Sequence, residues 1–163
     1  MTSQRVAEPS TGAAGTEAAA PATPDQPAAS RAAGIARRVY VIGIRLLALL
    51  VVAQFLLAGL GIFFDPQFLA WHAAAGAGAI GLLSLLLVPV GRVGRVPGRT
   101  LWLTASVLGL VIVQSLLLAP YHLAATGILR AVSGLHVVNA LLIFWVVLQL
   151  LARTRPASIG AMS

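Results

Sequence analysis

The sequence predicts an all-α integral membrane protein, a four-helix bundle with a disordered N-terminal tail. Of 163 residues, 59% are hydrophobic and only 9% are charged, whereas a soluble domain carries roughly 25% charged residues. Four apolar runs also reach the length of about 20 helical residues that crossing a bilayer core requires. The runs are apolar over whole helical turns and lack an alternation of period two, which favours spanning helices over barrel strands.

The first segment, residues 1–34, is predicted to be a disordered tail rich in Ala, Pro and Thr. It has no apolar period, so folding would bury too little surface to offset the entropy of ordering the chain. It also holds three of the four acidic residues, Glu8, Glu17 and Asp25. A cleaved signal peptide is not expected, because the first basic region that leads into an apolar run begins near Arg37.

Residues 35–155 are predicted to form the bundle, and residues 156–163 a short C-terminal tail. The expected spans cover residues 39–64, 68–90, 101–119 and 128–152. Short breakers separate them: Asp65-Pro66, then the Gly- and Arg-rich loop of residues 91–99, then Pro120-Tyr121-His122. Because all three connections are short, consecutive spans should run antiparallel.

The arginines predict the orientation of the bundle. They precede the first span, occupy the loop between the second and third, and follow the fourth, whereas Arg130 alone lies beside the loop between the third and fourth spans. The positive-inside rule therefore places both termini in the cytoplasm, in a multi-pass protein of the inner cell membrane. The net charge of +7 is on this interpretation a topological signal, with the lipid bilayer and its anionic head groups as the partner, and nucleic-acid binding is not expected.

A weak internal repeat relates the first two spans to the last two. Gln54 precedes His72 by 18 residues, and Gln114 precedes His136 by 22 residues. At 1.5 Å per helical residue, both histidines should lie roughly 10 Å inside the outer end of the bundle. We expect them to face each other at one level, with Gln114 at similar depth and Gln54 about one turn deeper.

Two neutral imidazoles at one level in a dry core suit the axial ligation of a haem iron. The sequence therefore predicts one b-type haem between His72 and His136, for electron transfer or haem handling. The small residues around Gly76 would leave room for the macrocycle, and Gln54 or Gln114 would orient an imidazole through its second nitrogen. At the outer surface, Arg130 or His122 would meet the haem propionates. A haem near one face needs a redox partner, such as a quinone or a second subunit.

Other interpretations stay open. Gln and Asn side chains often hydrogen-bond between membrane helices, so the protein is alternatively a cofactor-free accessory or scaffold protein with structural histidines, and a homo-oligomer is possible in either case. A zinc or copper site built from His72, His122 and His136 is a weaker alternative. A small transporter is a third, although the spans lack acidic residues for proton coupling. No phosphate loop, nucleophile elbow or carboxylate pair is present, so an enzyme is not expected.

Three stretches, residues 54–63, 72–76 and 135–140, resemble those of a small actinobacterial family of four-helix membrane proteins without assigned function, and this resemblance covers residues 38–152. The plan also resembles one half of haem A synthase, whose four-helix halves carry haem-related histidines on their second and fourth helices. That resemblance implies His72 and His136 as the matching positions. Leu69 stands where the catalytic half has a glutamate, and the cysteine-bearing outer loop is missing, so the resemblance implies holding haem b and not oxidising a haem methyl group.

Overall fold

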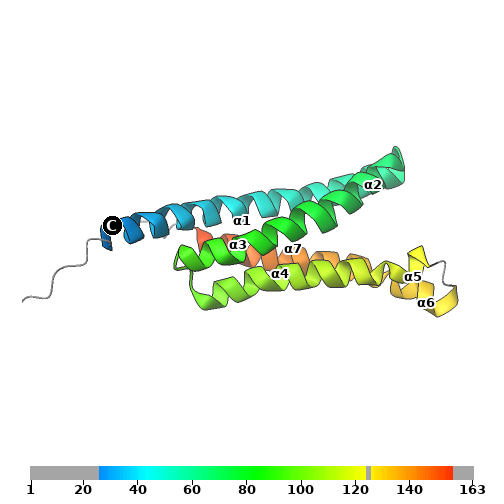
Figure 1. Ribbon diagram of the computed structural model, residues 1–163. Helices are drawn as coiled ribbons and strands as arrows, with labels where there is room; N and C mark the ends of the chain where they lie inside the picture. The colour runs from blue at the N-terminus through cyan, green and yellow to red at the C-terminus, as the bar shows by residue number, and fades with distance from the viewer. Residues whose placement is uncertain (1–25, 124–125, 156–163) are drawn as a thin grey trace, which may run out of the picture.

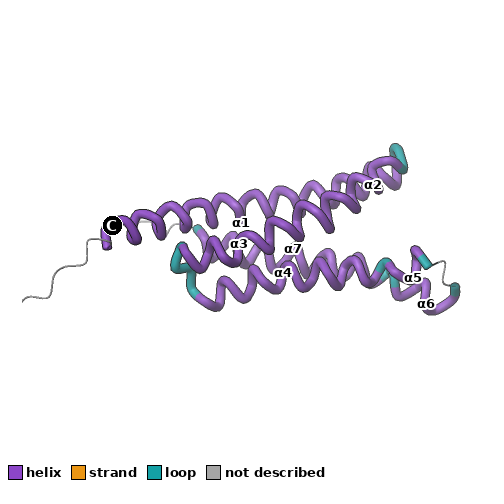
Figure 2. Tube along the Cα trace, viewed as in Figure 1, coloured by secondary structure: helices purple, strands orange, loops and turns teal. Residues whose placement is uncertain are grey.

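The chain folds into a bundle of four long helical segments, each long and apolar enough to cross a membrane. The computed structural model describes residues 26–123 and 126–155 (Figure 1). Within these ranges every regular element is helical (Figure 2), so the predicted fold class is confirmed. The expected tails at residues 1–25 and 156–163 lie outside the described residues. In chain order the elements are α1 (Gln26–Phe63), α2 (Gln67–Ala73), the π-helix η1 (Ala74–Ile80), α3 (Gly81–Val93), α4 (Gly98–Leu117), α5 (Ala119–His122), α6 (Gly127–Val132) and α7 (Leu135–Thr154).

Three of the four segments differ in detail from the predicted spans. Helix α1 begins at Gln26, so residues 26–34, expected in the tail, form its first turns. Alanine is the best helix former, and five alanines between residues 28 and 36 explain the extension. The second segment changes from α- to π-helix over Ala74–Ile80. In the fourth segment a turn at Ser133-Gly134 separates α6 from α7, where both residues are weak helix formers.

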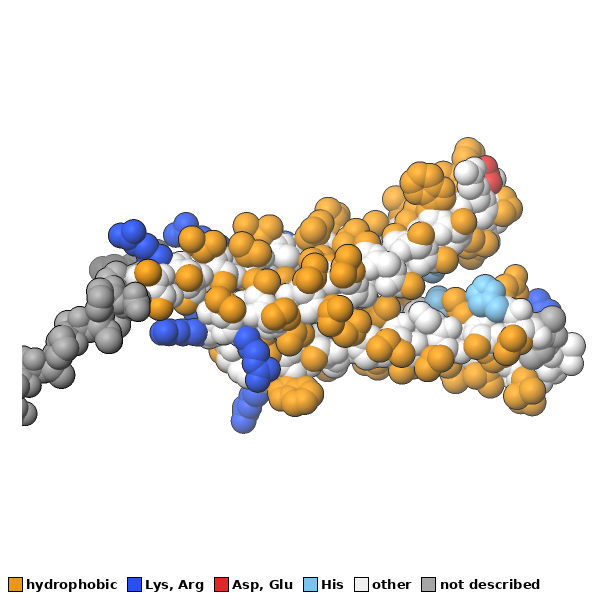
Figure 3. All heavy atoms as spheres, viewed as in Figure 1, with side chains coloured by type: hydrophobic (Ala, Val, Ile, Leu, Met, Phe, Trp, Pro, Cys, Tyr) orange, Lys and Arg blue, Asp and Glu red, His pale blue; other side chains and the backbone are white. Residues whose placement is uncertain are grey.

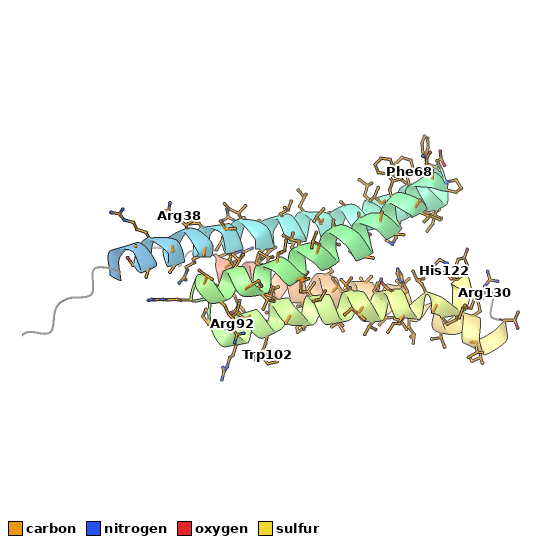
Figure 4. All side chains as sticks on the ribbon, viewed as in Figure 1. Arg38, Phe68, Arg92, Trp102, His122 and Arg130 are labelled. Carbon is orange, nitrogen blue, oxygen red and sulfur yellow. The ribbon has the colours of Figure 1, made fainter. Side chains whose placement is uncertain are left out.

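The two ends of the bundle differ in charge. We call the end that carries both described termini and the α3–α4 loop the basic end, because Arg38 and Arg92 lie there (Figure 4). The opposite end, which carries α2, α5 and α6, is called the histidine end. Between them the surface is almost entirely apolar (Figure 3), as expected for helices in contact with lipid.

The apolar core fills only the basic half of the bundle. Helix α1 approaches α3 closely there, because a Cβ added to Gly43 would lie 2.4 Å from Leu87 Cδ2. The buried Tyr40 hydroxyl donates to Thr104 Oγ1 at 2.7 Å, and Thr104 in turn donates to the Thr100 carbonyl. Towards the histidine end, the apolar core stops at a layer of four side chains, one from each long segment: Val51, Ile80, Val111 and Ile143.

Beyond that layer the helices diverge. The α1–α2 arm separates from the arm formed by α4, α5, α6 and α7 (Figure 1). Helix α2 packs mainly on α1 and η1, whereas α5 and α6 pack on each other and on α4 and α7 respectively. The histidine half therefore has room between its helices.

Candidate functional site between the two helical arms

A cavity of about 520 Å³ occupies the space between the arms. Its floor is the layer of Val51, Ile80, Val111 and Ile143, which closes it towards the basic end. His72 and His136 line it, and Figure 3 shows histidine side chains in the opening between the arms. Its volume falls within the range of about 300–1,000 Å³ that is typical of small-molecule and cofactor sites.

His72 lies near the end of α2, one residue before the π-helix begins. Its Nδ1 lies 3.0 Å from the main-chain carbonyl oxygen of Gln54 on α1. A carbonyl oxygen can only accept a hydrogen bond, so Nδ1 carries the proton and Nε2 carries the lone pair. This contact also places Gln54 level with His72, and not one turn deeper as the residue count suggested.

His136 lies in the first turn of α7 and repeats this arrangement. Its Nδ1 lies 3.3 Å from the main-chain carbonyl oxygen of Gln114 on α4. The 22-residue interval in this half, against 18 in the first, accommodates α5, α6 and the turn before α7. In both halves the histidine is thus held in one tautomer by the backbone of the preceding long helix.

The predicted approach of the two histidines is found in the structure. Their ring centres are 6.2 Å apart, with an angle of 57° between the ring planes. Within the described part of the chain no hydrogen bond reaches either Nε2. Two nitrogen lone pairs from opposite arms therefore border one apolar cavity.

The two glutamine side chains are not equivalent. Asn139, one turn after His136, donates from Nδ2 to Gln114 Oε1 and to the Leu110 carbonyl, the latter at 2.9 Å. The position one turn after His72 is Ala75, so Gln54 has no such neighbour. Its Nε2 is buried without a hydrogen-bond partner.

Small residues form the cavity wall on the second segment. Ala73, Gly76 and Ala77 all line the cavity. A Cβ at Gly76 would lie 3.1 Å from Gln54 Oε1, so the glycine makes space for the glutamine amide as well as for a ligand. The adjoining π-helix is a feature frequently found at functional sites.

The predicted role of Arg130 at the site needs correction. Arg130 does not line the cavity; its guanidinium lies 5.3 Å from the centre of the Tyr121 ring. Tyr121 in turn makes an edge contact with His122, whose side chain does border the cavity. Figure 4 shows His122 and Arg130 near each other at the histidine end. The three-histidine metal site is not supported either, because the described residues contain no group of three metal-binding side chains.

Comparison with known proteins gives a partial match. Residues 54–121 match the model of a family described as a family of unknown function (DUF6220). The match begins at Gln54, includes His72 and Gln114, and ends before His136. No curated protein and no solved structure matches the chain. The resemblance to a membrane family without assigned function has this partial support, whereas the actinobacterial origin and the likeness to haem A synthase have none.

Sequence reasoning did not include Asn139 among the site residues. It treated the residue as a helix-packing side chain, although its position one turn after His136 was a signal. The π-helix had no signal beyond its small residues, because a run of Ala and Gly is also compatible with an α-helix.

Proposed function

We propose that this membrane protein binds one b-type haem between His72 and His136 and serves in electron transfer or haem handling. The carrying observation is the pair of imidazoles, each with Nδ1 hydrogen-bonded to a main-chain carbonyl and Nε2 free. Haem-ligating and metal-ligating histidines typically donate their second nitrogen in this way, which fixes the tautomer and raises ligand basicity.

The separation of the rings fits the donor set. With a metal–imidazole bond of about 2.0 Å and a ring nitrogen about 1.1 Å from the ring centre, two opposed imidazoles on one metal have centres about 6.2 Å apart. The observed 6.2 Å agrees with this value. The described residues bring no third metal-binding side chain to this pair, and an iron whose remaining ligands come from a macrocycle needs only two from the protein.

The rest of the cavity supports the same choice. Its lining is largely apolar, so it would hold a flat apolar macrocycle and exclude water, and small residues at Ala73, Gly76 and Ala77 provide clearance beside His72. His122 at the far end is the better candidate than Arg130 for contact with a propionate. When bound, the haem would supply a one-electron redox centre, whose potential depends on its axial ligands and the local dielectric.

Topology completes the proposal. The clustering of Arg38, Arg92 and the other arginines at the basic end places that end, with both termini, on the cytoplasmic side of the cell membrane. The histidine cavity would then lie near the outer face. One haem near that face needs a redox partner within the membrane or at its surface.

The test is the visible absorption spectrum of detergent-purified protein produced with added haem precursor. We expect a Soret band and, after reduction, the sharp α and β bands of a six-coordinate low-spin haem. His72→Ala and His136→Ala should each remove or shift these bands, and added imidazole should restore them in part. His122→Ala is the matched control and should retain them.

Two results would overturn the proposal. One is the lack of a Soret band after expression with adequate haem, and the other is a band that survives simultaneous replacement of His72 and His136 by Ala. Either would favour a cofactor-free accessory or scaffold protein. The hydrogen bonds of Asn139 to α4 are the observation that favours this second candidate, because they act purely between helices.

A further inference from the structure

The side-chain amide of Gln54 is the one feature of the cavity that haem ligation does not use. The backbone carbonyl of Gln54 holds His72, but its Nε2 is buried and makes no hydrogen bond. A buried donor without a partner costs about 1–3 kcal/mol, and native proteins rarely leave such a group unexplained. Gln54 borders the cavity, so a ligand there is within its reach.

The second half of the bundle shows what a satisfied glutamine looks like. Gln114 occupies the corresponding position, and its amide oxygen accepts from Asn139. The first half has Ala75 in place of that asparagine. Two halves that hold their histidines alike thus differ in one respect: only the first presents a free amide donor.

A second hollow lies beside the cavity on the lipid-facing surface. This groove, of about 300 Å³, runs between the second segment and α4 and is lined almost entirely by apolar atoms. Ala77, Val111 and Ser115 line both the groove and the cavity. Its outer rim includes Leu85 and Leu116, both more than half exposed, so it faces the acyl chains of the bilayer.

These features together define one kind of ligand. It accepts a hydrogen bond, it is uncharged because no charged side chain lines the cavity, and it has an apolar tail that continues into the groove. We propose that the cavity binds a lipid-soluble quinone, whose ring carbonyl accepts a hydrogen bond from Gln54 Nε2 and whose tail passes between η1 and α4 into the groove. The proposal names the redox partner that the proposed function requires, but quinone binding itself depends on Gln54 and not on the histidines.

The experiment measures binding of a decyl-tailed 1,4-benzoquinone to the purified full chain in lipid nanodiscs. Saturable quenching of tryptophan fluorescence gives the affinity, and the infrared stretch of the quinone carbonyl reports the hydrogen bond. Gln54→Leu should weaken binding about tenfold and abolish the shifted carbonyl band, since one buried hydrogen bond is lost. It should leave the haem bands intact, because the backbone of residue 54 still holds His72.

Two further variants control the interpretation. Gln114→Leu, the matched control, should bind the quinone as the unmodified protein does, because the Gln114 amide already pairs with Asn139. Ala77→Leu would narrow the passage into the groove and should weaken the decyl-tailed quinone at least threefold more than a tail-less quinone. It supplies independent evidence should Gln54→Leu not fold.

The outcomes separate the two proposals. Non-saturable quenching by the unmodified protein, or equal affinity of the Gln54→Leu and Gln114→Leu variants, would overturn the quinone site whether or not haem is present. Simultaneous replacement of His72 and His136 by Ala should abolish the haem bands and retain quinone binding. A chain that binds quinone but never shows a Soret band would overturn the haem proposal alone.

Discussion

The polar contacts between α4 and α7 offer a sharp test of the structure through a double-mutant cycle on Asn139 and Gln114. Asn139 is 8% exposed and donates to both Gln114 Oε1 and the Leu110 carbonyl. Interhelical hydrogen bonds in membrane proteins average about 0.6 kcal/mol, with a maximum of about 1.7 kcal/mol. Asn139→Leu, which removes two of them, should therefore lower the free energy of unfolding by about 1.2 kcal/mol.

The cycle isolates the side-chain pair from the backbone contact. Gln114→Leu removes only the bond to Asn139, so its cost should be about half as large, and the coupling energy between the two substitutions should be about 0.6 kcal/mol. Reversible unfolding in mixed micelles, followed by far-ultraviolet circular dichroism, measures all four free energies.

Gln54→Leu provides the comparison from the other half of the bundle. It removes a buried amide whose Nε2 has no partner, and replacing such a group by an apolar one of similar size is often neutral or stabilising. We therefore expect its free energy of unfolding to equal or exceed that of the unmodified protein. A coupling energy of zero, or a Gln54→Leu cost as large as that of Asn139→Leu, would refute the inequivalence of the two halves.

Three further predictions concern the packing and topology of the bundle. Gly94→Ala should destabilise the protein by about 1–3 kcal/mol in the same unfolding assay, because the new Cβ would lie 2.8 Å from the backbone nitrogen of Arg37, whereas Gly98→Ala, with nothing within 4 Å, should be neutral; equal effects would contradict the close approach. Tyr40→Phe should cost about 1 kcal/mol through loss of one buried hydrogen bond, and an unchanged stability would argue against that contact. The chain contains no cysteine, so Phe64→Cys should react with an impermeant maleimide on intact cells and Gly98→Cys only after permeabilisation, and the reverse pattern would invert the topology.

Much of the fold was predictable because it follows from chemistry along the chain. Four apolar runs between short breakers indicate four spans wherever they occur, since a backbone in hydrocarbon must satisfy its own hydrogen bonds. The boundaries were less accurate. Helix α1 begins thirteen residues before Val39, the first residue of the predicted span, because alanine sustains a helix even in a segment with no apolar face to bury.

The candidate site was predictable only in part. Counting residues from the breakers placed His72 and His136 at one level, and the structure brings their rings together. Gln54 and Gln114 were expected to orient the imidazoles, and they do so through their backbone carbonyls, which every residue type possesses. Residue identity therefore carried no information about that contact. Arg130 was misplaced because the turn at Ser133-Gly134 directs α6 away from the cavity opening.

The sequence by itself determined the composition of this protein's environment: apolar spans, arginines gathered at one end, and two histidines at equal depth. These properties depend on position along the helix axis, which a rise of 1.5 Å per residue converts directly from residue number. The tertiary structure decided everything that depends on rotation about that axis and on the distance between helices. It set the 6.2 Å between the imidazoles, opened the cavity where the apolar core ends, and gave Gln114 a partner while leaving Gln54 Nε2 without one. Those choices arise from packing between segments far apart in the chain, which no local pattern records.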